Sequence, residues 1–351
     1  MTQFKLTPTE TRQGIMDCME ARLVPFVQSS PGLGKSSIVR QIAKDYDFEL
    51  IDVRLSQCAP EDLMGLPMRR GEGDQARAFF APFETFPLAG QPLPPGKRGW
   101  ILFLDEFNSA SKSVQAAAYK PVLDHMVGQA HLHEDCFIVA AGNLSTDRAI
   151  VTQMGTAMQS RVVHIEMVVD HKETLKYAFR KNWDHRILGF LEFQPGKLHH
   201  FNPDHQDRTF ACPRTWEFAS LLCKDKPLEK VSLPLLAGTL SDGVAVELHS
   251  FMKEYSNLPT YRKICEEADT LAVPHSASTC YALVTSMMSQ FTEQSFSQAV
   301  RFVRRLSPEF QVVYFRGVVA QHPKMRTNPD YVRNITHLVK FLNEDETAQA
   351  A

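Results

Sequence analysis

The segment VPFVQSSPGLGKSS, residues 24–37, carries the strongest structural signal in this chain. An apolar run at 24–28 leads into a turn rich in serine and glycine, and a helical run at 38–46 follows. The turn nearly matches the pattern G-x-x-x-x-G-K-[ST], which binds phosphate when it joins a strand to a helix. Ser29 stands where the pattern has its first glycine, and serine can occupy that position when its backbone angles are ordinary. The sequence therefore predicts a phosphate-binding loop.

The residue types in this loop suit a nucleotide with its metal ion. Gly32 and Gly34 let the backbone bend so that successive N–H groups point at a phosphate, and the following helix adds its positive end. Lys35 is expected to reach the β- and γ-phosphates, and the Ser36 hydroxyl is expected to bind Mg²⁺. The predicted nucleotide-binding residues of the loop are Ser30, Pro31, Gly32, Leu33, Gly34, Lys35, Ser36 and Ser37.

Two later apolar runs end in polar residues. The run WILFLDE, 100–106, ends in Asp105 and Glu106, and a buried strand seldom ends in two carboxylates without a reason, because an unpaired buried charge is costly. Beside a nucleotide, Asp105 would hold Mg²⁺ through water, and Glu106 would polarise the attacking water as a general base. The run CFIVAAGN, 136–143, ends in Asn143, which can hold the attacking water or contact the γ-phosphate. An ordinary turn-forming asparagine is the alternative.

Two arginines are further candidates for the site. Arg161 directly precedes an apolar run at 162–167, where it can insert into the site of a neighbouring subunit. Such a finger neutralises charge in the transition state and is worth roughly 10³-fold or more in rate. A surface arginine is the alternative. Arg214, in CPRTWE (212–217), stands at the start of a predicted helix and can reach back to the phosphates from a second domain.

The composition excludes several classes of protein. The 351 residues exceed what one compact domain usually needs, and 44% hydrophobic residues exclude a mainly disordered chain. The net charge of −2 disfavours a protein that grips duplex nucleic acid along its surface. The seven cysteines are odd in number and never spaced C-x-x-C, which favours reduced thiols in the cytoplasm. The longest uncharged run, 270–292, is rich in serine and threonine, so we expect no membrane insertion.

The order of apolar and helical stretches predicts an α/β domain followed by helices. Candidate strands of a parallel sheet lie at 24–28, 48–55, 100–105, 136–141 and 162–167. Strand signals stop near residue 168, and helical patterns dominate from residue 213 onward. We expect an α/β nucleotide-binding domain at 1–168 and helical regions at 169–258 and 259–351.

These stretches together resemble the AAA+ ATPases, and among them the MoxR-like branch. The resemblance covers about the first 220 residues. It is carried, in the order found in that family, by SSPGLGKSS (29–37), APEDLMGLP (59–67), WILFLDEFNSASKSVQAAAYKPVLDH (100–125), FIVAAGNLSTD (137–147), SRVVHIEM (160–167) and CPRTWEFAS (212–220).

The resemblance implies a P-loop AAA+ core, with a five-stranded sheet of order 5-1-4-3-2, then a helical lid and further C-terminal helices. It marks Lys35 and Ser36 as Walker A and Asp105 and Glu106 as Walker B. It also marks Asn143 as sensor 1, Arg161 as the finger and Arg214 as sensor 2.

The resemblance further implies ATP and Mg²⁺ as substrate and cofactor. It implies a homo-oligomeric ring, commonly a hexamer, that remodels a protein partner, in this branch often a von Willebrand factor A domain protein. Residues 61–67 and the turn at 127–128 resemble inserts that face the ring pore and contact substrate.

Two other functions stay open from the sequence. One is an ATP-gated assembly scaffold with little turnover, although a pure switch needs neither Glu106 as a general base nor an arginine finger. The other is a DNA-directed AAA+ protein, which the slightly negative net charge disfavours and salt-dependent binding to nucleic acid would reveal. A GTPase is weaker still, since the chain has no N-K-x-D motif for guanine.

Overall fold

The computed structural model describes residues 4–147, 152–204 and 207–347. The chain divides into two compact units, Met1–Asp170 and His171–Ala351, and each is described by itself. The division into three regions at 168 and 258 stays a prediction.

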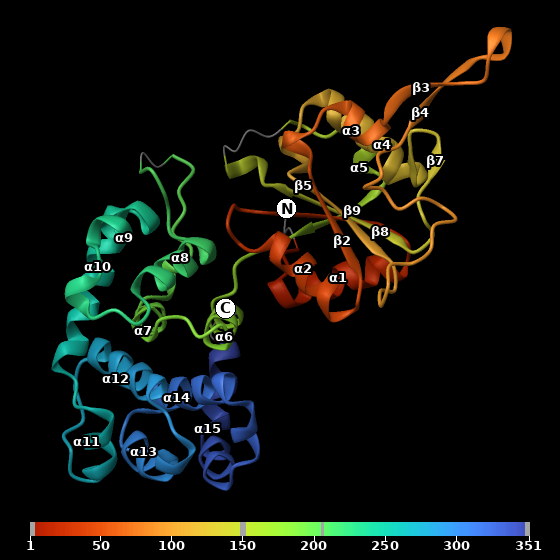
Figure 1. Cartoon of the computed structure of the whole chain (residues 1–351). Coiled ribbons are helices and arrows are strands. Elements are labelled where there is room, and N and C mark those ends of the chain that lie inside the picture. Colours follow the sequence, from red (N-terminus) through yellow and green to blue (C-terminus); the bar gives the residue numbers. More distant parts are fainter. Residues whose placement is uncertain (1–3, 148–151, 205–206, 348–351) are drawn as a thin grey trace. The chain divides into compact units, whose positions relative to one another are not determined.

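The first unit is built on a parallel five-stranded sheet, as the sequence predicts (Figure 1). The strands lie in the order β2 (Glu49–Arg54), β5 (Trp100–Asp105), β8 (Cys136–Asn143), β1 (Val24–Ser29) and β9 (Val162–Glu166). Counted within this sheet alone, that order is 2-3-4-1-5, which is 5-1-4-3-2 read from the opposite edge. The chain-wide labels differ from these numbers because two hairpins contribute four further strands.

Helices cover both faces of this sheet, which is why its central strands are apolar on both sides. On one face α1 (Pro8–Glu20) and α2 (Lys35–Asp45) bury Ile15 and Ile42 against residues such as Phe103. On the other face α4 (Lys112–Asp124) buries Ala118 among residues that include Leu102. At the start of α1, Thr7 and Glu10 form a capping box, in which each side chain accepts from the backbone N–H of the other residue.

Two hairpins interrupt the α/β order. Between β2 and β5 lie the short helix α3 (Pro60–Met64) and the strands β3 (Leu66–Arg70) and β4 (Arg77–Ala81), which project from the unit (Figure 1). Between α4 and β8 lie β6 (Met126–Val127) and β7 (Ala130–His131). These two inserts, residues 60–81 and 126–131, meet at Gly128, which has φ +58°. A Cβ added to Gly128 would stand 2.5 Å from the carbonyl oxygen of Met64. The sequence pattern did not predict this β3–β4 hairpin.

The second unit is built of helices. A 13-residue helix, α12, contacts both α7 and α14. Phe296, Val300 and Val303 lie on α13 (Phe296–Val303), and all three side chains are buried. The bounds are α6 (His171–Arg180), α7 (His185–Phe193), α8 (Pro213–Cys223), α9 (Leu233–Leu240), α10 (Asp242–Met252), α11 (Tyr261–Glu266), α12 (Ala277–Ser289), α13 (Phe296–Val303), α14 (Pro308–Gln321) and α15 (Pro329–Thr347).

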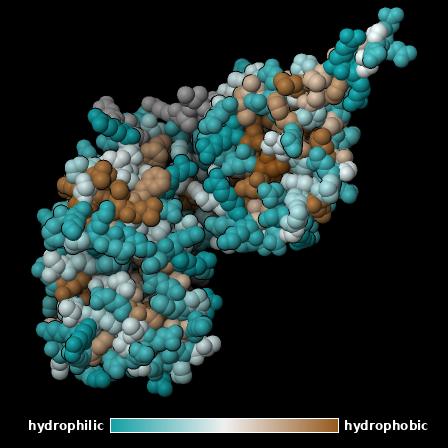
Figure 2. Space-filling model, in the orientation of Figure 1, coloured by the Kyte–Doolittle hydropathy of each residue, from teal (hydrophilic) through white to brown (hydrophobic). Residues whose placement is uncertain are grey.

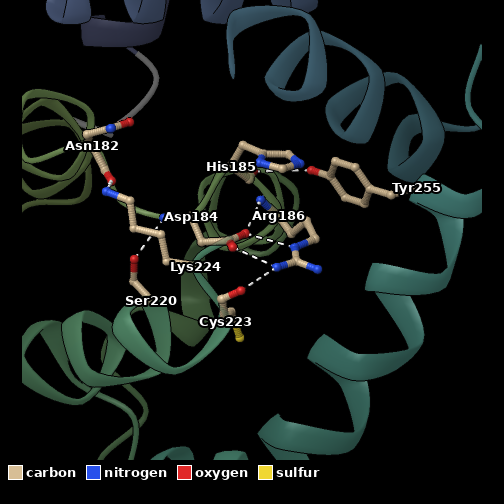
Figure 3. A network of polar contacts seen from close by, with 8 residues as sticks. All are labelled: Asn182, Asp184, His185, Arg186, Ser220, Cys223, Lys224 and Tyr255. Carbon is tan, nitrogen blue, oxygen red and sulfur yellow. Dashed lines mark hydrogen bonds and ion pairs between the residues drawn. The ribbon is translucent and has the colours of Figure 1, made fainter. Parts of the chain in front are cut away.

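A buried ion pair joins α7 to α8 in this unit (Figure 3). The guanidinium of Arg186 donates from Nε to Asp184 Oδ1 at 2.9 Å and from Nη2 to Asp184 Oδ2 at 2.7 Å. Nη2 also donates to the carbonyl of Cys223, the last residue of α8, at 2.7 Å. The backbone N–H of Asp184 donates to the Ser220 hydroxyl at 2.8 Å. These bonds fix the start of α7 on the end of α8.

The surface of the second unit carries apolar side chains over α9 and α10 on the face shown in Figure 2. Leu235 of α9 is 55% exposed and Val246 of α10 is 54% exposed. Within the part of the chain that is described, no helix combines the length and the apolar character needed to cross a bilayer.

Candidate nucleotide-binding site

The phosphate loop joins β1 to α2, which is the context that its sequence requires. Gly32 and Gly34 have φ angles of +79° and +96°, a region that other residue types rarely adopt. Gly34 is the N-cap of α2 and has no side chain with which to cap it, so the first turn of the helix is left to bind an anion. Ser29 is fully buried and is not among the residues with positive φ, so the serine fits where the pattern has glycine.

Lys35 lies between the carboxyl ends of two neighbouring strands. Its Nζ donates to the carbonyl oxygen and the hydroxyl of Ser29, both at 3.0 Å, and to Asn143 Oδ1 at 3.3 Å. Ser29 ends β1, Asn143 ends β8, and the two residues are partners in the parallel pairing of these strands. The structure thus brings together a lysine and an asparagine that are 108 positions apart in the sequence.

Ser36 and Asp105 meet at the same edge of the sheet. The Ser36 hydroxyl donates to Asp105 Oδ2 at 2.7 Å. A hydroxyl and a carboxylate are the oxygen donors that Mg²⁺ prefers, so this pair fits the ion that the family implies. The two residues come from α2 and from the end of β5, and they would hold the ion beside the phosphate loop.

Glu106 follows Asp105 in an unusual backbone conformation, with φ +56°. Its backbone N–H donates to Asp105 Oδ1 at 2.9 Å, and its carboxylate accepts a hydrogen bond from the Ser56 hydroxyl. Ser56 lies just after β2, whose last residue, Arg54, is the partner of Asp105 in the sheet. The sequence does not mark Ser56 as a site residue, although its place after a strand that neighbours β5 puts it at the edge where Glu106 lies.

Asn108 was also missed. It is 3% exposed and makes two hydrogen bonds with the backbone of Asn143. The only sequence signal is its position two residues after Glu106, and nothing in the sequence shows that it contacts β8.

The structure places Arg161 away from these residues within one chain. Arg161 precedes Val162, which pairs with Val24, the first residue of β1. It therefore lies at the amino ends of the strands, whereas Lys35, Asp105 and Asn143 lie at the carboxyl ends. Its side chain is exposed and donates to the carbonyl of Ala157 at 2.9 Å.

Arg214 belongs to the second unit. It is exposed in the first turn of α8, whose N-cap is Cys212. Its contact with the phosphates stays a prediction, as do the individual roles assigned to the other site residues.

A phosphate loop on a parallel sheet, with carboxylates and an amide at the same edge, defines a P-loop nucleotide-binding domain. Residues 26–162 match the model of the family described as "ATPase family associated with various cellular activities (AAA)". The first unit therefore contains a domain of the AAA ATPase family.

Two solved structures are similar to the chain at a distant level. One, from Cytophaga hutchinsonii ATCC 33406 and described as a proposed ATPase, is 12% identical and has a TM-score of 0.35, with 94% of this chain and 88% of that chain covered. Another, a mutant of RuvB from Thermotoga maritima, is 13% identical and has a TM-score of 0.39, with 84% of this chain and 90% of that chain covered. Likeness at this level carries no functional conclusion.

Proposed function

We propose that this chain is a Mg²⁺-dependent ATPase of the MoxR-like AAA+ branch. It hydrolyses ATP in the cytoplasm, works as a homo-oligomeric ring, which we expect to be a hexamer, and uses the energy to remodel or activate a protein partner. A von Willebrand factor A domain protein is the kind of partner that the resemblance favours.

The observation that carries the proposal is the meeting of Lys35, Ser36, Asp105, Glu106 and Asn143 at the carboxyl edge of one sheet. They come from three separate segments: the start of α2, the end of β5 with the residue that follows it, and the end of β8. A purely structural role would need only a cation and one carboxylate as an ion pair. This set contains a cation, two carboxylates, a hydroxyl and an amide around a loop shaped for phosphate. That is the set of groups that phosphoryl transfer to water requires.

Each residue has a task that its position allows. Lys35 binds the β- and γ-phosphates, exchanging its bonds to Ser29 and Asn143 for phosphate oxygens. Glu106 accepts a proton from the attacking water, and Ser56 orients the carboxylate that does so. Ser36 and Asp105 would hold Mg²⁺, which would supply positive charge to neutralise the phosphate oxygens.

The position of Arg161 supports a ring. Arg161 lies at the amino end of β9, whereas the phosphate loop of its own chain follows the carboxyl end of β1. The length of the strands separates the two. A finger from Arg161 therefore has to enter the site of another copy. Arg214 is proposed to contact the phosphates from the lid.

The two inserts support a shared surface for the partner. Residues 61–67 and 127–128 are proposed to contact substrate, and their backbones approach closely where Gly128 lies against Met64. A displacement of one insert on binding the partner should therefore displace the other insert as well.

The test is ATP turnover measured against protein concentration for the wild type, Glu106→Gln and Arg161→Ala. Turnover per chain should rise with concentration and should be lost in both variants. Mixing the two variants should restore part of the activity, because each supplies the group that the other lacks.

The other outcomes separate the alternatives. Turnover that is independent of concentration and unaffected by Arg161→Ala would refute the finger between subunits. Binding of ATP without turnover, with or without added partner, would favour the assembly scaffold. Binding to nucleic acid that weakens steeply with salt would favour the DNA-directed function.

A further inference from the structure

We propose that Asn108 is a positioning residue, whose side-chain amide clamps the backbone of Asn143 and so fixes where the Asn143 amide stands. The inference rests on the proposed function, because it takes Asn143 to act in ATP hydrolysis.

The clamp has two points of attachment. Asn108 Nδ2 donates to the carbonyl oxygen of Asn143 at 2.7 Å, and Asn108 Oδ1 accepts from the backbone N–H of Asn143 at 3.0 Å. One side chain therefore satisfies both backbone groups of the same residue, as a neighbouring strand would. Because both ends of the Asn143 backbone are held, its Cα–Cβ bond points in one direction, and its Oδ1 accepts from Lys35 Nζ at 3.3 Å.

Asn108 packs closely against Gly142 of β8. A Cβ added to Gly142 would stand 2.3 Å from Asn108 Oδ1 and 2.9 Å from the Cζ atom of Phe26. Gly142 is not among the glycines with positive φ, so its small size serves this close approach rather than an unusual backbone angle. A glycine at position 142 therefore allows the Asn108 amide to lie directly against β8.

Asn108 also connects Asn143 to Glu106. It is the middle residue of a single-turn helix, Phe107–Ser109, whose N-cap is Glu106. Its own carbonyl oxygen accepts from the backbone N–H of Thr152 at 2.6 Å, which holds Asn108 from a further side. The general base and the asparagine of β8 thus belong to one rigid assembly. Catalysis depends on such positioning, since a misplacement of about 1 Å can cost about 10²-fold in rate.

The first experiment is a double-mutant cycle on kcat. Asn108→Ala should lower kcat by about 10- to 100-fold, while the affinity for a fluorescent non-hydrolysable ATP analogue stays within about twofold of wild type. If Asn108 acts through Asn143, adding Asn108→Ala to Asn143→Ala should lower kcat by less than about twofold more. Full additivity of the two losses would overturn the proposal.

The second experiment reads the clamp directly in the nucleotide-free protein. Hydrogen exchange should accelerate in the peptide that covers residues 137–147 when Asn108 is replaced by alanine, because the N–H of Asn143 loses its acceptor. If that variant fails to fold, Asn108→Leu keeps a side chain of similar size but loses both the donor and the acceptor, and exchange in the same peptide should accelerate. Unchanged exchange in a folded variant would overturn the proposal.

The control is Val139→Ala, a fully buried position on the same strand that packs in the core on the α1 and α2 side. It weakens packing without touching Asn143, so its kcat should stay within about twofold of wild type. A loss as large as that of Asn108→Ala would mean that any weakening of β8 suffices, and would also overturn the proposal. A wild-type chain that binds but never hydrolyses ATP would refute the proposed function, whereas the exchange experiment would still decide whether the clamp exists.

Discussion

Replacing Arg186 with methionine should destabilise the second unit by about 3–5 kcal/mol, the usual cost of removing one partner of a buried ion pair. The side chains of Arg186 and Asp184 are 8% and 3% exposed, so water screens the pair very little. The change removes three hydrogen bonds donated by the guanidinium, two to Asp184 and one to the carbonyl of Cys223. It also leaves the Asp184 carboxylate buried without its cation, which is the larger part of the cost.

The loss should depend on pH in a defined direction. Burial alone raises the pKa of Asp184, but the hydrogen bonds and charge of Arg186 outweigh burial and hold that pKa below its ordinary value. A lowered pKa gives stability that is complete above the pKa of the unfolded chain and is lost as pH falls through the folded pKa. Without Arg186 the pKa of Asp184 should rise, so the difference between variant and wild type should shrink from about pH 7 to about pH 5.

The assay is urea unfolding followed by tryptophan fluorescence. Trp183 and Trp216 are buried in the second unit and Trp100 lies in the first, so a Trp100→Phe background restricts the signal to the second unit. The control adds Asp184→Asn to Arg186→Met. It removes the stranded charge, keeps an N-cap for α7, and should recover at least about 1 kcal/mol. A loss below about 1 kcal/mol for Arg186→Met, or no recovery in the double variant, would refute this account of the pair.

Three other predictions follow from single contacts. Ser56→Ala should lower kcat about tenfold with little change in ATP affinity, because the Glu106 carboxylate loses the hydroxyl that orients it. Steady-state kinetics that gave an unchanged or higher kcat would contradict this prediction. Gly128→Ala should lower the free energy of unfolding by at least about 1 kcal/mol, since its φ of +58° and the nearby carbonyl of Met64 both disfavour a Cβ; urea unfolding with an equal midpoint would contradict this. Burial raises the pKa of Cys136 to about 12 and that of Cys223 to about 11, so at about pH 8 both thiols stay protonated and iodoacetamide should label the more exposed Cys58 and Cys265 first; mass spectrometry showing early labelling of Cys136 would contradict this.

Much of the first unit could be predicted from its sequence, because the central strands β1, β5 and β8 are short, mainly apolar runs. Asp105, Glu106 and Asn143 are recognisable since a polar residue directly follows such a run. The phosphate loop is recognisable since glycine, lysine and serine occur at a fixed spacing. In a parallel sheet the carboxyl ends of the strands share one edge, so these local signals are enough to bring the residues together.

The parts that the sequence did not reveal depend on distant or exposed contacts. Ser56 meets Glu106 across 50 positions and Asn108 meets Asn143 across 35, and neither side chain carries a local signal of its partner. The hairpin β3–β4 buries almost none of its residues, so the alternation that marks a half-buried strand is missing. The ion pair of Asp184 and Arg186 looks in sequence like two ordinary surface charges.

The strand order also sets when the domain can fold during synthesis. β1 is made first, yet its two neighbours in the sheet are β8 and β9, which are made last. About 107 residues separate the end of β1 at Ser29 from the start of β8 at Cys136. At a ribosomal rate of about 5–20 residues per second, the start of β8 is synthesised about 5–20 seconds after β1. Its apolar residues stay exposed for that time, so the nascent chain needs protection from aggregation before the phosphate loop can form.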